Sequence, residues 1–458
     1  MPIDVSAPPL RRARTIPVHR VLPNFARDPA NTLADIGGQV DGELVRLGLG
    51  PFRPYLVTRP DHVQQVLKSD WTSYQREGMF WRPLRRVLGA SILGEGEPWE
   101  SSRRALQPLF TTRRVASLAE RMAEIINERM DELDEYAGSG RLVNAAEQMA
   151  RIVNAAIVGA LFGGRISRAD GERLAPAYDT AAGSITFRLV MPFMPYSIRV
   201  PGDRAFMKAV ETIDEVVFPL IRKARADSSG GPDVISALCD LRDDDEAGNR
   251  QIRDDLVSVY GAASESTAMT LTWLWPLLDA HPEIAARLQE EIDGVVGSGP
   301  VAAGHVPELR YTRMVLQELL RLYPAGWIFP RMAMRDGEIG GVRIKAGSQV
   351  LISPYATHRL EEFWERPLEF DPERFAPGDR PRRHKYAYFP FGGGPHQCLG
   401  QHLFYVEAPL LLGAILGRFR IGVRSKGPFT AAAAASLRPK QDIELEITRA
   451  GRVAGGVR

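Results

Sequence analysis

Residues 390–400 read Pro390-Phe-Gly-Gly-Gly-Pro-His-Gln-Cys-Leu-Gly400, and this segment decides the fold. Three consecutive glycines and two prolines within eleven residues exclude an ordinary helix or strand. Glycines let the backbone approach a bulky group closely, and nearby amides can spread the charge of an iron-bound thiolate. Taken alone, the segment fits equally well a glycine-rich turn with a buried cysteine and a loop whose Cys398 ligates a metal.

The chain has one other cysteine, Cys239, which lies far from Cys398 in the sequence. Its surroundings, residues 234–241, are helix-like and predict a buried free thiol. Two distant cysteines in a chain without an export signal do not indicate a disulfide framework. A structural zinc site is a poor competitor for Cys398, because no second cysteine or close Cys/His pair supplies the required spacing.

Composition places the chain among ordinary globular proteins. It has 458 residues, 44% of them hydrophobic and 25% charged, without a low-complexity tract. No Pro/Gly/Ser-rich or highly charged linker divides it, so we expect a single domain over residues 27–458. Residues 1–26 are rich in proline and arginine and are expected to form a poorly ordered extension.

The net charge and the hydropathy of the chain bear on two questions: whether it binds nucleic acid and whether it enters a membrane. A net charge of only +2 makes nucleic acid an unfavoured partner. The N-terminal residues lack the apolar core of a signal peptide. The longest apolar runs, residues 271–278 and 408–416, are far shorter than the roughly 20 residues that span a bilayer. We therefore expect a cytoplasmic protein without a transmembrane anchor.

The glycine-rich segment resembles the haem-binding signature of the cytochrome P450 superfamily, Phe-x-x-Gly-x-x-x-Cys-x-Gly, in which Phe391, Gly394, Cys398 and Gly400 match every fixed position. This resemblance implies that the Cys398 thiolate is the axial ligand of the iron in haem b, with Phe391, Gly392 and Gly400 also in the cofactor loop. It further implies a mainly α fold with small β regions, described as a triangular prism, with haem between a long helix and this loop.

A second landmark lies upstream, in the helical pattern of residues 311–324, which ends at a proline. Glu318 and Arg321 are neighbours on one face of this helix and, considered alone, would form a solvated surface pair. Residues 370–375, Phe-Asp-Pro-Glu-Arg-Phe, resemble the next landmark of the family. The resemblance implies that Glu318, Arg321 and Arg374 form a buried charged triad that supports the cysteine loop.

A long apolar helix is predicted over residues 251–280, with small and polar residues at its middle, 260–268. The Ser266 hydroxyl could bond the carbonyl of Ala262, four residues back, and open the helix locally. From composition alone, this polar stretch favours a helix face turned to solvent over a functional site.

The same stretch resembles the oxygen-activating helix of the family, usually Ala/Gly-Gly-x-Asp/Glu-Thr-Thr/Ser. The resemblance implies catalytic roles for Glu265, Ser266 and Thr267, and contact of Ala262 with the cofactor. Ser266 replaces the usual threonine that helps to deliver protons to dioxygen, and Ala263 replaces the usual glycine. Serine keeps the hydroxyl on a freer side chain, which puts the coupling of oxygen reduction to product formation in question.

Cationic partners for the two haem carboxylates come from two further motifs. Trp99 and Arg103 lie four residues apart on one predicted helix face and match the family pattern Trp-x-x-x-Arg. Arg331 falls where the family has a strand arginine, and His396 stands where many relatives have arginine. Without the resemblance, these would be a packed tryptophan beside a surface arginine and a solvated loop histidine.

Substrate contacts are expected from variable loops. Residues 74–88 and 187–196 resemble substrate-recognition regions by position, and the second also holds Phe193 and Met194. Their aromatic and methionine side chains favour a lipophilic substrate, such as a terpenoid, polyketide or aromatic natural product, although core packing explains such residues equally well. The candidate pocket residues are Phe80, Trp81, Phe187, Met191, Trp327 and Ile328.

The resemblance implies a monooxygenase that inserts one atom of O2 into this substrate. Only 60 residues follow Cys398, so we expect electrons from a separate ferredoxin and ferredoxin reductase. Basic residues before the loop, Arg382, Arg383 and Lys385, could bind an acidic carrier or could be an ordinary solvated charge run. Alternative functions are oxidative C-C or C-N coupling, peroxide-driven oxidation, and a non-catalytic haem-binding sensor.

Overall fold

The computed structural model describes residues 10–450 except 164, 185–196, 228–232 and 379–382. The chain forms two compact units, and each unit is built from three separate segments of the sequence. Unit 1 comprises residues 1–78, 326–369 and 378–398, and unit 2 comprises residues 79–325, 370–377 and 399–458. The expectation of one domain over 27–458 stays a prediction.

Unit 1 holds most of the β structure. Its elements are β1 Arg14–Ile16, α1 Val18–Arg27, α2 Pro29–Gln39, β2 Val45–Leu47, β3 Tyr55–Val57, α3 Pro60–Gln64, η1 Gln65–Ser69, η2 Trp71–Ser73, β4 Tyr74–Gln75, β6 Phe329–Ala333, β7 Gly337–Ile339, β8 Val342–Ile344, β9 Gln349–Ile352, α15 Pro354–Thr357, η6 Lys385–Ala387 and η7 Gly394–His396.

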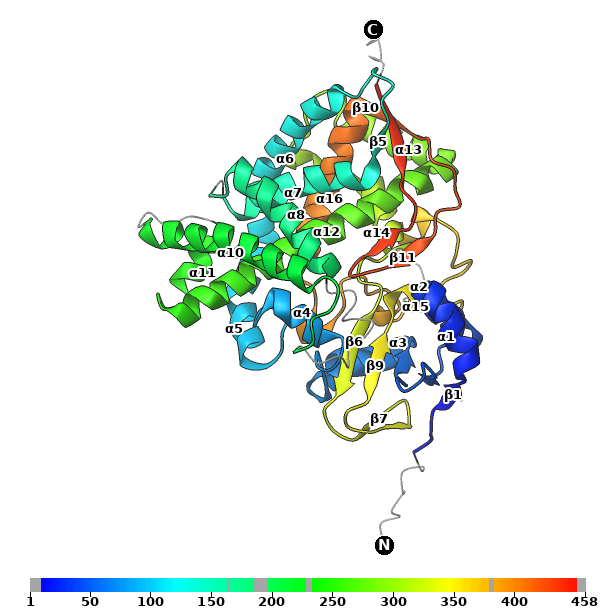
Figure 1. Ribbon diagram of the computed structural model, residues 1–458. Helices are drawn as coiled ribbons and strands as arrows, with labels where there is room; N and C mark the ends of the chain where they lie inside the picture. Colours follow the sequence, from blue (N-terminus) through cyan, green and yellow to red (C-terminus); the bar gives the residue numbers. More distant parts are fainter. Residues whose placement is uncertain (1–9, 164, 185–196, 228–232, 379–382, 451–458) are drawn as a thin grey trace. The chain divides into compact units, whose positions relative to one another are not determined.

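Six strands of unit 1 form one sheet in the order β1-β2-β3-β9-β6-β4. The fourth and fifth strands of this sheet, β9 and β6, are antiparallel neighbours (Figure 1). Arg331 of β6 pairs with Val350 of β9. Aliphatic and aromatic side chains such as Val57, Val350 and Phe389 are buried together beneath the sheet. β-branched residues such as Val57, Val350 and Ile352 pack well on a buried sheet surface, and this packing stabilises the short strands β3 and β9.

Residues 14–26 are ordered, although the sequence led us to expect a poorly ordered extension. β1 pairs in parallel with β2, and Ile16 lies opposite Leu47. α1 follows at once and buries Val21 completely. This anchoring depends on a strand whose residues lie 31 positions further along the chain, so local composition could not reveal it.

Unit 2 is mainly helical. Its elements are α4 Trp81–Leu88, α5 Gly96–Leu106, η3 Gln107–Phe110, α6 Thr112–Asp134, β5 Val143–Asn144, α7 Ala145–Leu161, α8 Arg168–Ser184, α10 Asp203–Ala226, α11 Val234–Asp240, α12 Glu246–Ala280, α13 Pro282–Val295, η4 Ala303–His305, α14 Arg310–Leu322, η5 Pro372–Phe375, α16 Gln401–Arg418, β10 Phe419–Val423, β11 Ala431–Ala433, β12 Leu437–Pro439 and β13 Glu444–Arg449.

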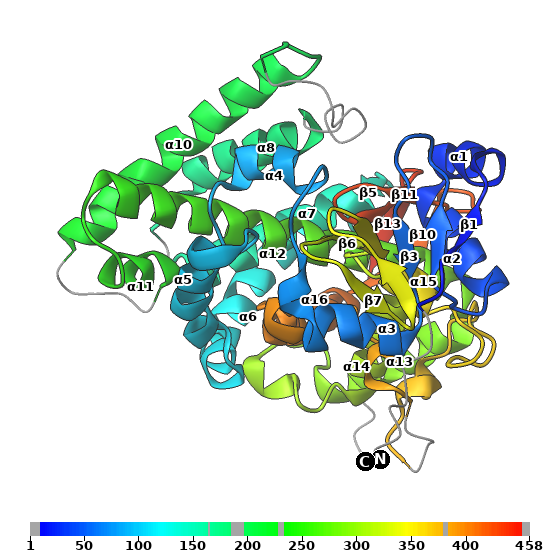
Figure 2. The same cartoon turned by 90° about the horizontal axis from the view of Figure 1, so that it is seen from below.

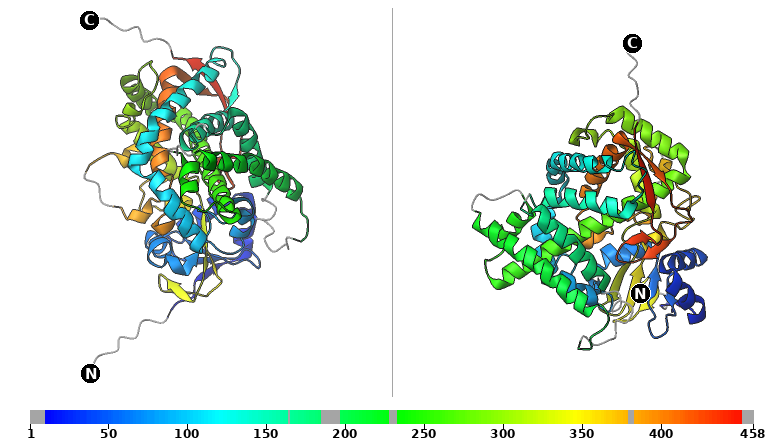
Figure 3. Two further views of the ribbon diagram at one scale, coloured as in Figure 1. Left: turned by 90° about the vertical axis from the view of Figure 1, so that its left-hand side faces the viewer. Right: turned by 45° about the horizontal axis from the view of Figure 1, so that its top comes forward.

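Helix α12 is the central element of unit 2. It packs against α7, α10, α13, α14 and α16 (Figure 1). α8 and α10 lie against each other (Figure 2), and α16 lies along α6, orange beside cyan in Figure 3. Because α12 is surrounded, most of its residues are buried, including some that are polar.

The predicted helices are confirmed with small shifts at their ends. The helix expected over 251–280 begins earlier, at Glu246, because the Asp245 side chain caps it by accepting a hydrogen bond from the Gly248 amide. The helix expected before Pro324 is α14, and the one after the cysteine loop is α16. Cys239 lies buried in α11, as predicted, and burial raises the pKa of its thiol.

The chain has the mainly α fold that the sequence predicted. Within the described residues, Gly394–Arg418 is the one helical stretch long and apolar enough to cross a membrane, and 67% of its apolar window is buried inside the protein. A buried apolar helix of this kind is typical of a protein core.

Candidate functional site

The cysteine loop of unit 1 is a tight irregular segment. A 3-10 turn, η7, precedes Cys398, whose side chain is exposed. The Cys398 amide donates a hydrogen bond to the Phe391 carbonyl at 2.9 Å, and the Gln397 amide donates to the Gly394 carbonyl at 3.1 Å. These bonds close the loop on itself and present the sulfur at its end.

Two glycines of the loop have positive φ, Gly392 at +69° and Gly394 at +67°. A Cβ atom placed on Gly394 would lie 1.9 Å from the carbonyl oxygen of Leu67. No side chain fits there, because the loop backbone rests directly on the π-helical turn η1. The glycine that matches the family signature is therefore needed for contact with a distant segment of the chain.

Residues shortly after η1 also support the loop, and sequence reasoning missed them. The Trp71 ring meets the His396 ring edge-on at 5.4 Å between centroids. The Arg76 Nη2 atom donates to the His396 carbonyl at 3.3 Å. Both His396 and Arg76 are buried, so His396 is a packed residue rather than the solvated loop histidine of the alternative interpretation.

The approach to the loop is held by two buried side chains from residues 358–364. The His358 Nε2 atom accepts a hydrogen bond from the Phe389 amide at 2.9 Å, which places the neutral ring's proton on Nδ1. The Trp364 indole donates to the Ala387 carbonyl at 3.1 Å. Sequence reasoning used His358 only as a landmark, whereas the structure gives it a positioning contact.

Arg331 lies on β6 of the same unit and is only 5% exposed. Its Nη1 atom donates to the neighbouring Pro330 carbonyl at 2.8 Å. A buried guanidinium requires compensating partners, since its desolvation is costly. Arg331 thus places a guanidinium group in the interior of unit 1.

In unit 2, Trp99 and Arg103 lie on α5, as the sequence predicted. Trp99 is buried, and Arg103 is half-buried. The Arg103 Nε atom donates to the side-chain oxygen of Gln107 at 3.0 Å. One helix face therefore carries an indole and a guanidinium one turn apart.

The charged triad is formed. Glu318 and Arg321 are 0% exposed, and the guanidinium binds the carboxylate through two bonds, Nε to Oε2 at 2.7 Å and Nη2 to Oε1 at 2.8 Å. Arg374 approaches Glu318 Oε1 at 3.3 Å, and the Asp371 amide donates to the same oxygen at 3.0 Å. The alternative of a solvated surface pair is excluded, and residues 371–374 are fastened to α14.

The polar middle of α12 carries the predicted back-bond. The Ser266 hydroxyl donates to the Ala262 carbonyl at 2.6 Å. The expected local opening of the helix is not seen, because α12 is α-helical without interruption from Glu246 to Ala280. A hydroxyl that shares its carbonyl acceptor with the helical amide can be accommodated without breaking the helix.

Glu265 turns towards β12. Its carboxylate lies 3.9 Å from the Arg438 guanidinium, which is half exposed. Burial raises the pKa of Glu265, Asp179 reinforces the rise, and Arg438 opposes it. Burial likewise raises the pKa of Asp179, which Arg438 again opposes. Arg438 therefore serves two carboxyl groups from α8 and α12, a partnership that the sequence did not indicate.

Thr267, the third residue of the predicted catalytic group, faces a buried acid, Glu407 of α16. Glu407 is 0% exposed, and burial raises the pKa of its carboxyl group to about 8, although the Thr267 hydroxyl partly offsets this. The group is therefore protonated at neutral pH. Sequence reasoning missed it, but Glu407 is the only acidic residue of the apolar helix Gln401–Arg418, which was an available signal.

The predicted substrate-contact residues are divided between the units. In unit 2, Phe80 is the N-cap of α4 and Trp81 is its first residue, whereas Trp327 and Ile328 precede β6 in unit 1. Trp327 is 7% exposed, and its carbonyl accepts a bond from the Ser353 hydroxyl at 2.9 Å. The others predicted, Phe187 and Met191, lie outside the described residues, as does Arg382.

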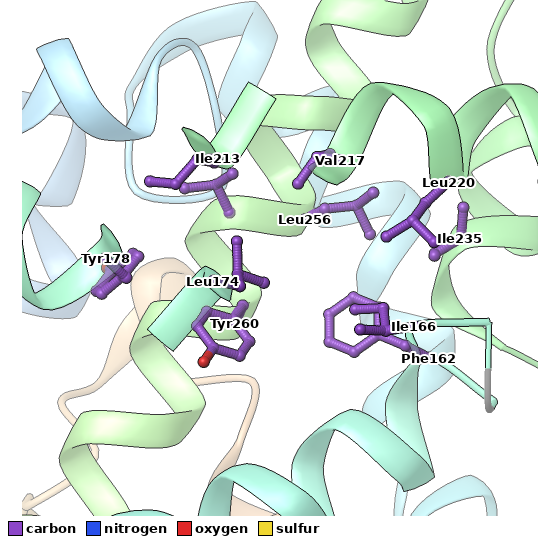
Figure 4. A pocket seen from close by; sticks show the side chains of 11 residues that line it. Phe162, Ile166, Leu174, Tyr178, Ile213, Val217, Leu220, Ile235, Leu256 and Tyr260 are labelled. Carbon is purple, nitrogen blue, oxygen red and sulfur yellow. The ribbon is translucent and has the colours of Figure 1, made fainter. Parts of the chain in front are cut away.

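An apolar pocket in unit 2 is too small for a substrate. It lies between α8, α10 and α12, and its side chains, among them Leu174, Ile213, Leu256 and Tyr260, converge on it (Figure 4). Its volume of about 10 Å³ admits roughly one water molecule. It is a packing gap beneath the α8–α10 pair.

Each unit, taken by itself, holds side chains of a kind that haem b requires. Unit 1 offers an exposed thiol on a loop whose glycines bring the backbone close, together with the buried Arg331 and His396. Unit 2 offers Trp99 and Arg103. A soft sulfur ligand for iron and cations for two carboxylates are the donor set that this cofactor requires.

Comparisons with known proteins agree with these features. The family model described as Cytochrome P450 matches residues 19–446. A cyclooctatin synthase of Streptomyces melanosporofaciens is 33% identical over 411 residues, which cover 87% of this chain and 86% of the relative. A pentalenene oxygenase of Streptomyces avermitilis is 28% identical over 413 residues, which cover 89% and 90%.

The fold has solved counterparts. The crystal structure of the cytochrome P450DA haem domain superposes with a TM-score of 0.85 at 24% identity and covers 97% of this chain and 99% of that one. At this level of identity the likeness concerns the fold.

Glu407→Gln is predicted to remove a pH dependence of stability. The pKa of Glu407 in the folded protein, about 8, lies above its ordinary value of 4.5. Its contribution to stability is therefore complete below about pH 4.5 and is lost as pH rises through about 8, by at most about 5 kcal/mol. Urea unfolding at pH 5 and pH 8.5 measures this: the variant should match the wild type at pH 5 and exceed it at pH 8.5.

The matched control for this measurement is Glu246→Gln, a glutamate on α12 whose side chain is 87% exposed. Its stability should follow the wild type at both pH values within about 0.5 kcal/mol. Parallel pH profiles of wild type and Glu407→Gln would contradict the prediction.

Proposed function

The chain belongs to the cytochrome P450 family, and from that premise we propose that the Cys398 thiolate would hold the haem iron and that its substrate is a terpenoid-like lipophile. It is a cytochrome P450 monooxygenase, an oxidoreductase that carries haem b. Haem b supplies the electron-transfer and oxygen-activating chemistry. The protein's residues hold that group, position the substrate and move protons.

The observation that carries the ligand assignment is the exposed Cys398 side chain at the end of the closed glycine loop. The Cys398 amide bonds the Phe391 carbonyl, so we assign stabilisation of the sulfur's negative charge to the amides that follow it, those of Leu399 and Gly400. Phe391 and Gly392 shape the loop backbone. The contact of Gly394 with Leu67 limits movement of the loop, which keeps the sulfur in one place.

Cations hold the carboxylates of the cofactor in this proposal. Arg331 is the strongest candidate, because it is buried and permanently charged. His396 is a weaker one, since its charge depends on pH and its ring is packed against Trp71. Arg103 and the Trp99 indole bind the carboxylate on their side.

Proton delivery is assigned to α12. The Ser266 hydroxyl donates to the Ala262 carbonyl, and by rotating about its side-chain bond it can donate to dioxygen instead. Burial raises the pKa of Glu265, which favours the protonated form of its carboxyl group and makes it the proposed proton donor of this helix. Thr267 lies next in the sequence and faces the protonated Glu407. Serine rotates more freely than threonine, so the hydroxyl spends less time in the productive direction.

The substrate class follows from relatives whose names specify their reactions. One is a pentalenene oxygenase, another a cyclooctat-9-en-7-ol 5-monooxygenase from Streptomyces melanosporofaciens, 31% identical over 437 residues that cover 92% of both chains. We assign a cyclic terpenoid and its hydroxylation or epoxidation to this chain, with Phe80, Trp81, Trp327 and Ile328 as apolar contacts.

Redox partners are part of this chemistry, and we assign a separate ferredoxin and ferredoxin reductase in the cytoplasm. Of the basic residues before the loop, Lys385 begins η6, while the Arg383 guanidinium lies 4.3 Å above the Trp364 ring. That stacking holds Arg383 at the surface, where it can meet an acidic carrier.

Cys398→Ser is expected to abolish the thiolate signature. Haem ligated by an alcohol or water cannot give the long-wavelength Soret band that a thiolate ligand produces in the reduced carbon monoxide complex. The difference spectrum of purified protein measures this. Cys239→Ser is the matched control, since it removes the only other cysteine from a buried helix and should keep the band. A thiolate band in Cys398→Ser would refute the ligand assignment.

Ser266→Ala is expected to lower product formed per NADPH consumed by about ten- to hundredfold, because the proton donor is lost while binding is not. Ser266→Thr should equal or exceed the wild type. Product and hydrogen peroxide are measured together with a ferredoxin system. Thr272→Val is the control, because Thr272 also back-bonds on α12, to the Ala268 carbonyl at 2.8 Å. Unchanged coupling in Ser266→Ala would remove Ser266 from proton delivery.

Terpenoid substrates should shift the Soret band as they displace water from the iron, and polar compounds of similar size should not. A titration against cyclic terpenes and terpene alcohols measures this, followed by turnover under labelled dioxygen. One labelled oxygen atom in the product is the expected result. Turnover without label would favour oxidative coupling, and tight binding without NADPH consumption would favour a sensor.

A further inference from the structure

A stripe of four polar residues lies on one face of α12 in unit 2. Gln251, Asp254, Asp255 and Ser258 are spaced i, i+3, i+4 and i+7, which places them within a sector of about 100°. On the core face of a helix this spacing normally carries apolar side chains. Here Asp255 and Ser258 are 0% exposed, and Asp254 is 8% exposed. Because buried polar groups are costly unless they are bonded, the partners of the stripe decide its role.

Three members of the stripe bind the residues that follow α4. The Ala90 amide donates to Asp254 Oδ2 at 2.9 Å, and the Gln251 side-chain amide donates to the Ala90 carbonyl. The Ser258 hydroxyl donates to the hydroxyl of Ser91, which is 0% exposed, at 2.7 Å. Both backbone groups of Ala90 are therefore bonded to α12, and the next side chain is bonded as well.

Gly89 ends α4 at this contact. Its φ of +58° lies in the left-handed region, and its amide donates to the Arg85 carbonyl at 2.9 Å. A Cβ atom placed on Gly89 would lie 1.9 Å from Asp254 Oδ2. Glycine is needed here for two reasons: the backbone turns out of the helix, and it rests directly on a carboxylate.

The Asp254 carboxylate is held from both sides. Its Oδ1 atom accepts a hydrogen bond from Arg253 Nη1 at 3.0 Å, while Oδ2 accepts the Ala90 amide. Arg253 also binds Asp214 of α10, Nε to Oδ1 at 2.7 Å. Directional bonds of this kind fix one arrangement of the bonded segment, whereas apolar packing tolerates small shifts.

The face that carries the stripe continues into the polar middle of α12. At about 100° per residue, Ala262 and Glu265 fall in the same sector as Ser258. Ser258 lies one helical turn, about 6 Å along the axis, before Ala262. The end of α4 is thus bonded to α12 one turn from the residues to which we assign cofactor contact and proton delivery.

We infer that Asp254 and Ser258 are positioning residues for ligand binding, because they hold the end of the helix that presents Phe80 and Trp81. These two residues are the N-cap and the first residue of α4, which has only eight residues. A displacement of its last turn is therefore passed to its first. The inference rests on the proposed function, in which Phe80 and Trp81 contact the substrate.

Hydrogen exchange of the ferric holoenzyme tests the positioning itself. Asp254→Ala removes the acceptor of the Ala90 amide, while Arg253 keeps its bond to Asp214. We expect peptides that cover residues 86–95 to exchange about ten- to hundredfold faster than in the wild type. Asp254→Asn keeps an acceptor oxygen, so its exchange should stay within about threefold of the wild type.

Two azole probes, titrated by the Soret band of the ferric holoenzyme, test the effect on binding. Clotrimazole is bulky and apolar and needs contacts beyond the iron, whereas imidazole needs the iron alone. Asp254→Ala and Ser258→Ala should each raise the Kd of clotrimazole by about three- to thirtyfold and leave the Kd of imidazole unchanged. In a background with Phe80→Ala and Trp81→Ala, Asp254→Ala should add less than about twofold, since it acts through these side chains.

Gly89→Ala reaches the same contact from the other partner. Its new Cβ atom displaces the Asp254 carboxylate while every group of α12 is retained. It should raise the Kd of clotrimazole in the same way as Asp254→Ala, and combining the two changes should add little.

The matched control is Asp233→Ala, which removes an aspartate of similar burial and bonding from unit 2. Asp233 is 4% exposed, its Oδ1 atom accepts from the Ser236 amide at 2.9 Å, and its Oδ2 atom accepts from Arg165 Nε at 2.9 Å. Asp233→Ala should lower stability, yet it should change neither the Kd of clotrimazole nor the exchange of residues 86–95.

Three results would overturn the inference. The first is unchanged exchange of residues 86–95 in Asp254→Ala. The second is an equal loss of clotrimazole and imidazole affinity, which would assign the effect to the cofactor site. The third is an equal loss in Asp233→Ala, which would reduce the effect to global stability. If no terpenoid shifts the Soret band while clotrimazole affinity follows the variants as expected, the substrate class is wrong and the positioning role stands.

Discussion

The buried ion pair between Glu318 and Arg321 is the interaction on which the arrangement before the cysteine loop depends. Both side chains are fully buried, and the carboxylate also receives the Arg374 guanidinium and the Asp371 amide. Two charges in the interior gain little net stability over apolar residues, but removing one partner strands the other at a cost of roughly 3 to 5 kcal/mol. The network therefore acts as a constraint: residues 371–374 can leave α14 only if a charge is left unpaired.

A second constraint governs α12. This helix is covered on most sides, yet it carries Glu265 and Ser266 at its middle. The hydroxyl is accommodated by a bond to the Ala262 carbonyl, and the carboxylate by Arg438 across the helix surface. Neither arrangement breaks the helix, so Glu265 and Ser266 both lie on a continuous helical support. Glu407 differs from Glu265 in its protonation. Burial raises the pKa of Glu407 to about 8, so its carboxyl group stays protonated and neutral at neutral pH.

Much of the site could be predicted because its motifs are local. The helix with Trp99 and Arg103, the pair at Glu318 and Arg321 and the glycine-rich loop each depend on residues within a few positions of one another. Their order along the chain indicated the family. The folded strand and helix near the N-terminus could not be predicted in the same way. β1 is stabilised by pairing with β2, which its own composition does not reveal. Likewise, nothing near Ser266 indicated that α12 stays continuous there.

The sequence by itself determined the helix spans and the irregular backbone of the cysteine loop, since hydrophobic periodicity and glycine conformations act over a few residues. The charged triad was implied only by the family resemblance, because the pair at Glu318 and Arg321 taken alone favours a solvated surface pair. Only the tertiary structure decided which distant groups meet: the Leu67 carbonyl with Gly394, Trp71 with His396, Arg438 with Glu265, and Thr267 with Glu407. The pKa of a carboxyl group likewise depends partly on the sequence and partly on the tertiary structure. Its ordinary value belongs to the residue type, but its shift is set by burial and by charges that folding brings near.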